Sequence, residues 1–271
     1  MNLNLTHIIS FCKGVFHGNS TEFTANHISI DSRSLQNGNN TLFFAIKGQN
    51  HDAHLYLEEL IAKGVRYFVV EYIPEHLYQK ANFIIVENSL KALQQTAIGY
   101  RKQFDFPFIG ITGSNGKTIV KEWLNFLLSP NHLIVRNPKS YNSQVGVPLS
   151  ILAIEGNYDL GIFEAGISLP NEMSNLKHII QPKYGILTNI GSVHDEGFSN
   201  REAKIKEKVQ LFENCSDIFL EKNTEIEALL PENSQKHTWS FSDESANLFV
   251  SKKNENGKTE LTFKNKANTF S

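Results

Sequence analysis

The residues of this chain that could do chemistry begin with a glycine-rich loop between an expected strand and an expected helix. The loop occupies positions 110–118 and reads GITGSNGKT. Glycines let backbone N–H groups turn toward phosphate oxygens, and the start of a helix adds partial positive charge. Lys117 supplies an ammonium group, and Thr118 supplies a hydroxyl that can ligate magnesium. The loop therefore predicts a nucleotide site formed by Gly113, Ser114, Asn115, Gly116, Lys117 and Thr118.

The spacing of this loop departs from the usual phosphate-binding pattern. That pattern would put a glycine at position 111, where this chain has isoleucine, and the glycines lie at positions 110 and 113 instead. The alternative is a glycine turn that only joins a strand to a helix. Such a turn does not need Lys117 and Thr118 at their positions, so the residues favour nucleotide binding.

Polar side chains near two other strand ends are candidates for a metal site, because ligands of open parallel sheets bind beyond the carboxyl ends of the strands. Glu164 closes an apolar strand, and its carboxylate could hold magnesium directly or through water. His194 lies in a glycine-containing loop after another strand. The alternatives are a solvated charge for Glu164 and an ordinary surface histidine for His194, since magnesium prefers oxygen ligands.

Lys208 lies beside an apolar stripe on the helix expected over residues 201–212. The stripe consists of Ile205, Val209 and Phe212, so the stem of Lys208 should point inward. Burial disfavours an ammonium and yields a nucleophilic amine, which can take up carbon dioxide as a carbamate and become an anionic metal ligand. The alternative, which periodicity alone favours, is a lysine that keeps its head group in water.

Two regions of different rhythm must position these residues. In the first, β-rich runs at 27–30, 41–46, 67–71 and 83–86 alternate with helical patterns at 55–63 and 89–104. Pro107 then interrupts the pattern, because the residue before a proline is pushed away from helix. We therefore expect a small α/β domain over residues 1–106 and a second domain over residues 107–271.

The second region predicts a mostly parallel sheet that contains the phosphate loop. Apolar strands alternate with helical patterns, which is typical of α/β domains with helices on both faces of the sheet. The expected strands span 108–112, 133–136, 160–164, 185–189 and 217–221, and the expected helices span 117–128, 145–153, 171–178 and 201–212. Near the end, the polar run at 254–257 between two strand-like segments predicts a hairpin.

The composition excludes several classes of protein. The chain has 271 residues, a formal net charge of −2 and two cysteines, Cys12 and Cys215. It lacks the basic character of a nucleic-acid binder and the cysteine pattern of a disulfide framework or a zinc site. It also lacks a recognisable signal peptide or an apolar run of about twenty residues. The sequence therefore predicts a cytoplasmic protein with no nucleic-acid partner and no membrane span.

Three motifs, in the same order along the chain, resemble those of the Mur ligases of peptidoglycan synthesis. The TGSNGKT run at 112–118 is similar to the family's phosphate loop, FEAG at 163–166 to its strand-end glutamate motif, and KVQLF at 208–212 to its carbamylated-lysine segment. Within the family, the resemblance is strongest to the MurF branch, which joins D-Ala-D-Ala to UDP-MurNAc-tripeptide.

Other segments resemble elements of the same branch that contact its substrates. The YNSQVGVPL run at 141–149 is similar to the motif NNxxGxPL, with Ser143 in place of the second asparagine. DSR at 31–33 and FAIKG at 44–48 are similar to elements of the UDP-sugar-binding domain, whereas DAH at 52–54 departs from the usual DGH. The resemblance implies substrate contacts by Ser32, Arg33, Lys47, Asn142 and Ser143.

The resemblance also implies a set of cofactors and catalytic roles. Lys117 and the loop amides would contact the phosphates of ATP, Thr118 and Glu164 would hold one magnesium ion, and His194 with carbamylated Lys208 would surround a second. Lys117, Lys208 and His194 are the residues implied to act in catalysis. The implied reaction activates the tripeptide carboxylate as an acyl phosphate, which the amine of D-Ala-D-Ala then attacks.

The resemblance covers the first domain and most of the central one, whereas members of the family continue into a third domain. We therefore expect a fragment that does not turn over alone. The SYNSQVGVPLS stretch at 140–150 is also similar to a subgroup that is fused to an alanine racemase, which implies such a domain in the full-length protein.

Two other functions are consistent with the same residues. Folylpolyglutamate synthases share a similar ATPase domain, but their phosphate loop usually lies near the N-terminus, whereas here it begins at Gly110. The other alternative is a non-catalytic nucleotide-binding module in which Glu164, His194 and Lys208 are structural.

Overall fold

The computed structural model describes residues 3–33, 35, 38–48, 50–191, 197–255, 258–265 and 269–270. By its contacts the chain forms two compact units, Met1–Asp105 with Gln144–Asn157, and Phe106–Ser143 with Tyr158–Ser271. The expected boundary between residues 106 and 107 lies next to this division. Residues 144–157, which we expected in the second domain, belong to the first unit. Among the helices of the described residues, none has the length and apolar character needed to cross a membrane.

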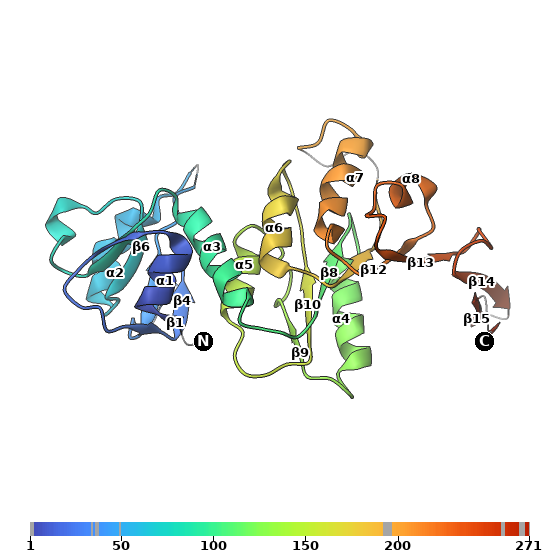
Figure 1. Ribbon diagram of the computed structural model, residues 1–271, viewed down its shortest axis with the longest axis horizontal. Coiled ribbons are helices and arrows are strands. Elements are labelled where there is room, and N and C mark those ends of the chain that lie inside the picture. The colour runs from blue at the N-terminus through green and yellow to red at the C-terminus, as the bar shows by residue number, and fades with distance from the viewer. Residues whose placement is uncertain are drawn as a thin grey trace. The chain divides into compact units, whose positions relative to one another are not determined.

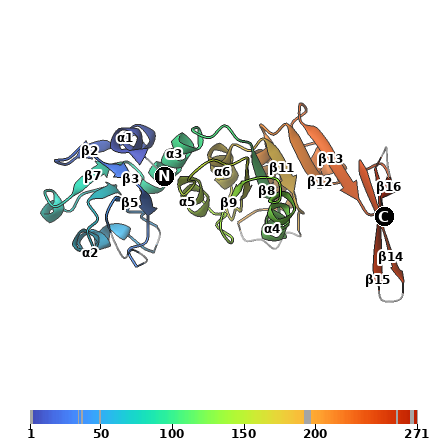
Figure 2. The same cartoon turned by 90° about the horizontal axis from the view of Figure 1, so that it is seen from below.

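The first unit is built on a sheet with the strand order β2-β7-β6-β5-β4, of which β4 and β6 are labelled in Figure 1 and β2, β5 and β7 in Figure 2. Strands β4 to β7 are parallel to their neighbours, and β2 pairs antiparallel with β7. A short antiparallel pair, β1-β3, accompanies it. The elements of this unit are β1 (Leu3–Asn4), α1 (Leu5–Cys12), β2 (Val15–His17), β3 (Thr24–Ala25), β4 (His27–Ser29), β5 (Thr41–Phe44), η1 (Ala53–Tyr56), α2 (Leu57–Ala62), β6 (Tyr67–Val70), η2 (Glu75–Leu77), β7 (Asn82–Ile85), α3 (Ser89–Arg101) and α5 (Gly146–Leu152).

Burial explains the composition of this unit. All four residues of β5 and all four of β6 are buried, as expected for continuous apolar runs in a parallel sheet. Helix α5 is apolar and packs against α3, with Val147, Ile151 and Leu152 fully or almost fully buried. This packing is the physical reason why residues 144–157 belong to the first unit.

The second unit contains a sheet with the strand order β16-β15-β14-β13-β12-β11-β8-β10-β9. From β9 to β14 in this order, neighbouring strands of the sheet are parallel. The pairs β14-β15 and β15-β16 are antiparallel. The elements are β8 (Phe108–Thr112), α4 (Lys117–Leu128), β9 (Ile134–Arg136), β10 (Leu160–Glu164), α6 (Glu172–Ile180), β11 (Tyr184–Leu187), α7 (Arg201–Val209), η3 (Gln210–Phe212), β12 (Asp217–Glu221), α8 (Thr224–Glu227), β13 (Gln235–Ser240), β14 (Leu248–Glu255), β15 (Lys258–Asn265) and β16 (Thr269–Phe270).

This architecture confirms the expected α/β fold with a mostly parallel sheet. Strands β14 and β15 pair in register from Leu248 with Asn265 to Glu255 with Lys258, which confirms the expected hairpin, although Asn256 and Gly257 lie outside the described residues.

Helical segments lie on both faces of the central strands of the second unit (Figure 2). On one face, Ile109 and Ile111 of β8 form an apolar cluster with Val120 and Leu124 of α4. On the other face, Gly110 lies opposite Leu211 of η3. The phosphate loop therefore leaves the sheet between these layers.

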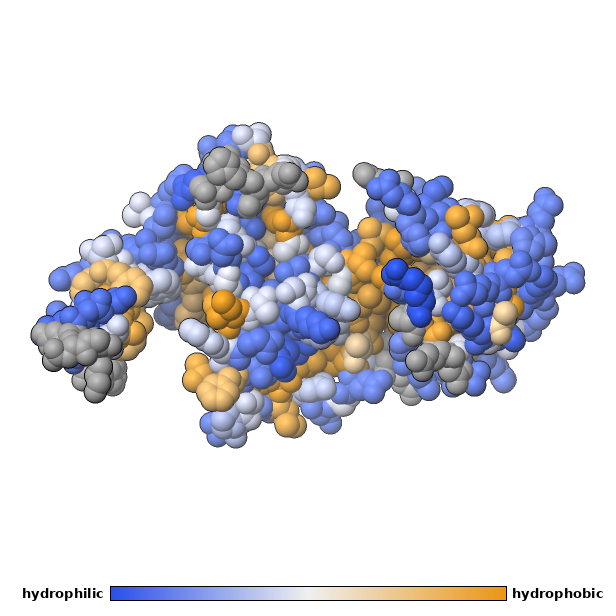
Figure 3. Space-filling view, turned by 180° about the vertical axis from the view of Figure 1, so that it is seen from behind, coloured by the Kyte–Doolittle hydropathy of each residue, from blue (hydrophilic) through white to orange (hydrophobic). Residues whose placement is uncertain are grey.

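Helix α4 buries only one side. Its outer side carries large apolar side chains that are 58–75% exposed, namely Ile119, Trp123, Phe126 and Leu127. Hydrophobic areas also lie among hydrophilic ones on the face of the molecule in Figure 3. The inner side of α4 carries Lys121, which is completely buried and belongs to the site described next.

Candidate nucleotide and metal site

The phosphate loop joins β8 to α4, and its turn depends on two glycines. Gly113 has a φ of +146° and Gly116, just before α4, a φ of +80°, values that glycine adopts without strain. A Cβ atom on Gly113 would lie 2.0 Å from Thr188 Oγ1 and 3.0 Å from backbone atoms of Asn189. The loop therefore passes the end of β11 so closely that a larger residue at 113 would displace it.

Asn189 holds the outer part of this loop. The Ser114 N–H donates to the Asn189 carbonyl at 2.8 Å, and the Asn115 N–H donates to Asn189 Oδ1 at 3.0 Å. Two of the amides expected to contact ATP phosphates are thus bonded to Asn189 in this structure. The first turn of α4 begins directly after them at Lys117, and the N–H groups of a first helical turn attract anions.

Two lysines from distant parts of the sequence meet at the loop. Lys117 Nζ donates to the carbonyl of Gly113 at 2.9 Å and to that of Ser114 at 3.3 Å. Lys208 Nζ, from α7, donates to the same Gly113 carbonyl at 3.2 Å, and Lys208 is only 3% exposed. Both side chains therefore meet at the Gly113 carbonyl, and the stem of Lys208 points inward, as its place beside the apolar stripe of α7 predicted.

Glu164 ends β10 and is completely buried beneath the start of α4. The Thr118 hydroxyl lies 3.1 Å from Glu164 Oε1 and 3.0 Å from Oε2. Lys121 Nζ donates to Oε1 at 3.0 Å, and Asn142 Nδ2 donates to Oε2 at 3.3 Å. The residue is therefore not the solvated strand-end charge of the alternative interpretation, and its carboxylate is bonded on both oxygens.

The donor set fits a magnesium ion. Glu164 contributes a carboxylate and Thr118 a hydroxyl, both oxygen groups, and magnesium is typically held by one or two carboxylates with water and substrate phosphates. Within the described residues no group of three or more histidine, cysteine, aspartate or glutamate side chains could hold a metal. His194, the expected ligand of a second ion, lies outside the described residues.

The residues predicted to contact substrate in the first unit follow β4 and β5. Arg33 donates to both carboxylate oxygens of Asp31 at 2.9 Å, while its own side chain is 88% exposed. Hydrogen bonds from the Arg33 side chain and backbone lower the pKa of Asp31 to about 2. Ser32 is buried, and its carbonyl accepts a hydrogen bond from Lys63, which directly follows α2. Lys47, by contrast, is exposed.

Asn142 and Ser143, which were also predicted to contact substrate, lie in the second unit. The side chain of Asn142 bonds to Glu164, and its carbonyl accepts the N–H of Gly166 at 2.8 Å. A Cβ on Gly166 would lie 2.9 Å from the Asn142 side chain. Asn142 therefore belongs to the carboxylate cluster, while Ser143 is exposed beside it in sequence.

The fold and the order of these features agree with one protein family. The Mur ligase middle domain matches residues 111–270. This chain belongs to the Mur ligase family. The UDP-N-acetylmuramoyl-tripeptide:D-alanyl-D-alanine ligase of Borreliella burgdorferi is 33% identical over 234 residues, which are 81% of this chain and 50% of that protein. The expected family resemblance is thereby confirmed.

Solved structures of Mur ligases share the fold. MurF from Acinetobacter baumannii matches 100% of this chain and 60% of its own with a TM-score of 0.89 at 21% identity. MurF from Thermotoga maritima, solved in complex with ADP, matches 90% of this chain and 57% of its own with a TM-score of 0.79 at 23% identity. The chain spans about half the length of the curated relatives it matches.

Three residues of this Mur ligase site escaped the sequence analysis. Lys121 and Asn137 are completely buried and both contact Glu164, and Asn189 holds the phosphate loop. A signal for Lys121 was present, because it lies beside the Val120 and Leu124 stripe of α4 just as Lys208 lies beside the stripe of α7. Nothing local marks Asn137, since its contacts with Glu164 come from β10, a strand distant in the sequence.

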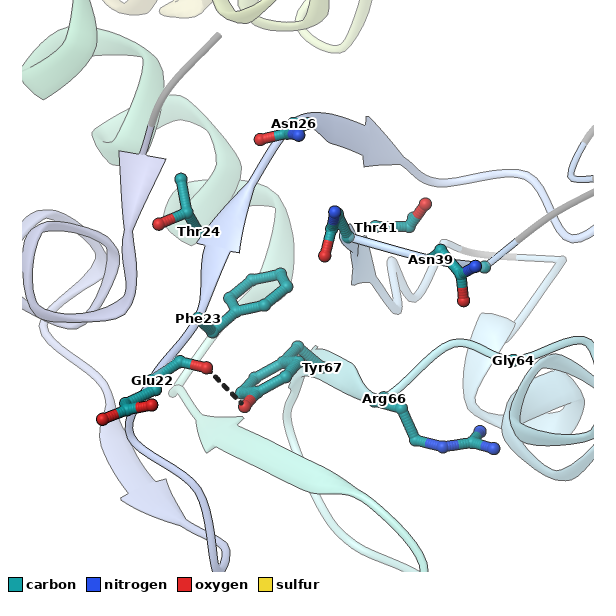
Figure 4. Close-up of a pocket in the computed structure, with 11 residues that line it drawn as sticks. Glu22, Phe23, Thr24, Asn26, Asn39, Thr41, Gly64, Arg66 and Tyr67 are labelled. Atoms are coloured by element: carbon teal, nitrogen blue, oxygen red, sulfur yellow. Dashed lines mark hydrogen bonds between the residues drawn. The ribbon is translucent and has the colours of Figure 1, made fainter.

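The first unit contains a cavity of about 560 Å³, whose lining residues are drawn in Figure 4 and do not include Ser32, Arg33 or Lys47. It is lined at the amino ends of β5 and β6, where Phe23 stacks on Tyr67 and the Tyr67 hydroxyl donates to the Glu22 carbonyl at 3.5 Å. The DSR and KG elements follow the carboxyl ends of β4 and β5. The cavity therefore lies at the opposite strand ends from the residues that were predicted to bind substrate in this unit.

Proposed function

We propose that the full-length protein is a magnesium-requiring, ATP-dependent ligase that adds D-Ala-D-Ala to UDP-MurNAc-tripeptide in peptidoglycan synthesis. The observation that carries the proposal is the Thr118–Glu164 pair, 3.0 Å apart, next to a phosphate loop that also receives Lys117 and Lys208. The curated relatives that match most of this chain bear the name of that activity.

In this proposal the loop holds the nucleotide. The first-turn amides of α4 and the Lys117 ammonium bind the β- and γ-phosphates of ATP, and loop residues 113–118 enclose them. Thr118 and Glu164 hold the magnesium ion, which when bound neutralises developing charge on the transferred phosphoryl group. Lys208, as a carbamate, and His194 hold a second ion.

The proposed reaction has two steps. The terminal carboxylate of the tripeptide attacks the γ-phosphorus, so that an acyl phosphate forms and ADP leaves. The amine of D-Ala-D-Ala then attacks the acyl carbon, phosphate leaves, the amine loses a proton, and an amide remains. The positive charge of Lys117 stabilises the phosphoryl transition state because it lies where negative charge collects.

The remaining roles are proposals of the same kind. Residues 1–106, together with the segment 144–157 that packs with them, form the UDP-sugar-binding domain with contacts from Ser32, Arg33 and Lys47. The rest of residues 107–271 forms part of the ATP-binding domain, with substrate contacts from Asn142 and Ser143. The protein acts in the cytoplasm, where its ATP is available. The resemblance at 140–150 further implies a fused alanine racemase, which would supply D-alanine.

A phosphate-release assay on the full-length protein tests this proposal. Phosphate release should require ATP, magnesium, UDP-MurNAc-tripeptide and D-Ala-D-Ala together, and EDTA should abolish it. Glu164→Gln should lower kcat by more than about 100-fold, above the 10–100-fold typical of residues that only support a metal ligand. Glu202→Gln, an exposed change on α7, is the matched control and should leave the rate unchanged.

The outcomes separate the alternatives. Release that depends on a folate and glutamate instead of the cell-wall substrates would identify a folylpolyglutamate synthase-like ligase. Nucleotide binding without release under either condition would identify a non-catalytic module and contradict the proposed function.

A further inference from the structure

Lys121 is a completely buried lysine whose ammonium contacts the candidate magnesium ligand. It lies on α4 one turn after Lys117, and its Nζ donates to Glu164 Oε1 at 3.0 Å. The same Nζ donates to the carbonyl of Asn137 at 2.7 Å and to that of Lys139. An ammonium has three N–H groups, so these three acceptors use all of them.

The other charged group near Lys121 contributes little. Glu122 Oε1 lies 3.5 Å from Lys121 Nζ, but Glu122 is 42% exposed and also bonds to Arg136. Water screens such a partner, whereas the Lys121 and Glu164 side chains are both 0% exposed. The positive charge of Lys121 is therefore directed at Glu164.

The contacts of Glu164 divide its two oxygens between different partners. Oε1 accepts a hydrogen bond from the ammonium of Lys121, and Oε2 accepts one from the amide of Asn142. The Thr118 hydroxyl lies within 3.1 Å of both oxygens. Asn137 brackets the backbone, because its Oδ1 accepts the Glu164 N–H at 3.1 Å and its Nδ2 donates to the Glu164 carbonyl at 3.1 Å. Neither the carboxylate nor its strand end is free to rotate.

A buried ion pair adds little net stability to the packing of a helix on a sheet. Desolvation of both charges offsets much of their attraction, and apolar side chains of similar size often stabilise a core as well or better. The ammonium of Lys121 can serve another purpose. It compensates the charge of Glu164 when no metal ion is bound, and it keeps the Glu164 carboxylate oriented toward the Thr118 hydroxyl.

We propose that Lys121 is a positioning residue, whose ammonium orients the Glu164 carboxylate for a divalent cation held next to Thr118, with Asn137 fixing the Glu164 backbone. The inference rests on the proposed function, because it assigns a support to the metal site of that function. Lys121 touches neither nucleotide nor cation in this arrangement and acts through Glu164.

Metal binding and nucleotide binding are measured separately on the full-length protein. Mn²⁺, as a probe for magnesium, is titrated in the presence of ADP and followed by electron paramagnetic resonance, and ADP alone is titrated in EDTA by calorimetry. Lys121→Met should weaken Mn²⁺ binding by about 10–100-fold, the range for residues that support metal ligands. ADP binding in EDTA should change less than about twofold, because the loop amides and Lys117 remain.

The controls separate this role from a structural one. Lys206→Met removes a lysine that pairs with Glu202 on an exposed face of α7 at 2.6 Å, and it should alter neither titration. Lys121→Gln keeps a hydrogen-bond donor without the charge and serves where the methionine variant folds poorly. It should also weaken Mn²⁺ binding by about tenfold.

Each outcome counts for or against the inference. Unchanged or tighter Mn²⁺ binding in the Lys121 variants overturns it, as does a parallel loss of Mn²⁺ and metal-free ADP binding. Failure of both variants to fold also overturns it, since Lys121 would then serve folding. If the unaltered protein binds neither ADP nor Mn²⁺, the proposed function fails first, and that result is distinct from wild-type binding with unaffected variants.

Discussion

Two carboxylates of this chain lie at or just after the end of a parallel strand and form an ion pair with a basic side chain, but the two pairs differ in how far they are exposed to solvent. Glu164 of the second unit and its partner Lys121 are both 0% exposed. Asp31 of the first unit is 39% exposed, and its partner Arg33 is 88% exposed. The first pair is surrounded by protein donors and acceptors, whereas the second is partly exposed to solvent.

The two environments suit the two pairs to different roles. Charges in a dry interior interact strongly and hold one geometry, which suits a ligand for a cation. An exposed pair contributes little to stability, but its guanidinium remains accessible to an anionic ligand such as a diphosphate. Substitutions of Lys121, Asn137, Thr118 and Asp31 distinguish these two environments.

Removal of the buried ammonium group of Lys121 should lower the free energy of unfolding most. Lys121→Met leaves the Glu164 charge buried without compensation, and the expected loss in the free energy of unfolding is about 3–5 kcal/mol. Urea unfolding followed by circular dichroism measures it. Lys121→Met with Glu164→Gln should recover much of the loss, because no charge is then left alone. A loss below about 1 kcal/mol, typical of an exposed pair, would contradict the contrast.

Removal of the backbone bracket should have the next largest effect. Asn137→Leu leaves the N–H and carbonyl of Glu164 and the carbonyl of Tyr141 without their partner. Buried groups left unsatisfied cost about 1–3 kcal/mol, and partial relaxation leads us to expect a total near 2–3 kcal/mol. Asn125→Leu, on the partly exposed side of α4, is the control and should change urea stability little. Equal effects of the two substitutions would argue against a special role of Asn137.

Removal of the Thr118 hydroxyl should have a moderate effect on stability and a selective effect on metal binding. Thr118→Val keeps the shape but removes the donor to Glu164, for an expected loss of about 1 kcal/mol. Thermal unfolding with and without Mg²⁺ and ADP measures both consequences. We expect the added ligands to stabilise the unaltered protein and to stabilise the variant much less. Equal stabilisation of the two proteins would contradict the proposed role of Thr118 as a magnesium ligand.

The exposed pair should produce the smallest effect, with a defined pH dependence. The pKa of Asp31 is lowered from 3.8 to about 2, so folding favours its charged form. Its stabilisation is therefore present above about pH 4 and disappears as the pH falls toward 2. Because the pair is exposed, Asp31→Asn should shift the thermal midpoint at pH 7 by no more than about 1 °C. A shift of several degrees, or one that persists at pH 2, would contradict this.

Most of the fold could be predicted from local pattern. The phosphate loop, the apolar strands around it and the amphipathic helices each carry a periodicity that neighbouring residues impose on one another. Residues 144–157 show the limit of this approach. Their sequence predicts a helix, but which unit that helix joins depends on α3, a segment about fifty positions away in the chain.

The candidate site divides in the same way. Gly113, Lys117 and Thr118 are recognisable from one short run, since that run alone forms the turn and the helix start. Lys121, Asn137 and Asn189 were not recognised, because their roles come from groups that are distant in the sequence. Lys208 stands between the two cases, since its inward direction follows from periodicity and its contact with Gly113 does not.

The kind of loop, the kind of sheet and the family could be predicted before the structure was known, because they depend on residue types at short, regular spacings. The complete burial of Glu164 and its contacts with Lys121, Asn137 and Asn142 depend instead on how distant segments pack in the folded chain. Parallel strands far apart in sequence end at one edge of a sheet, and the side chains that meet there are selected by packing across that edge.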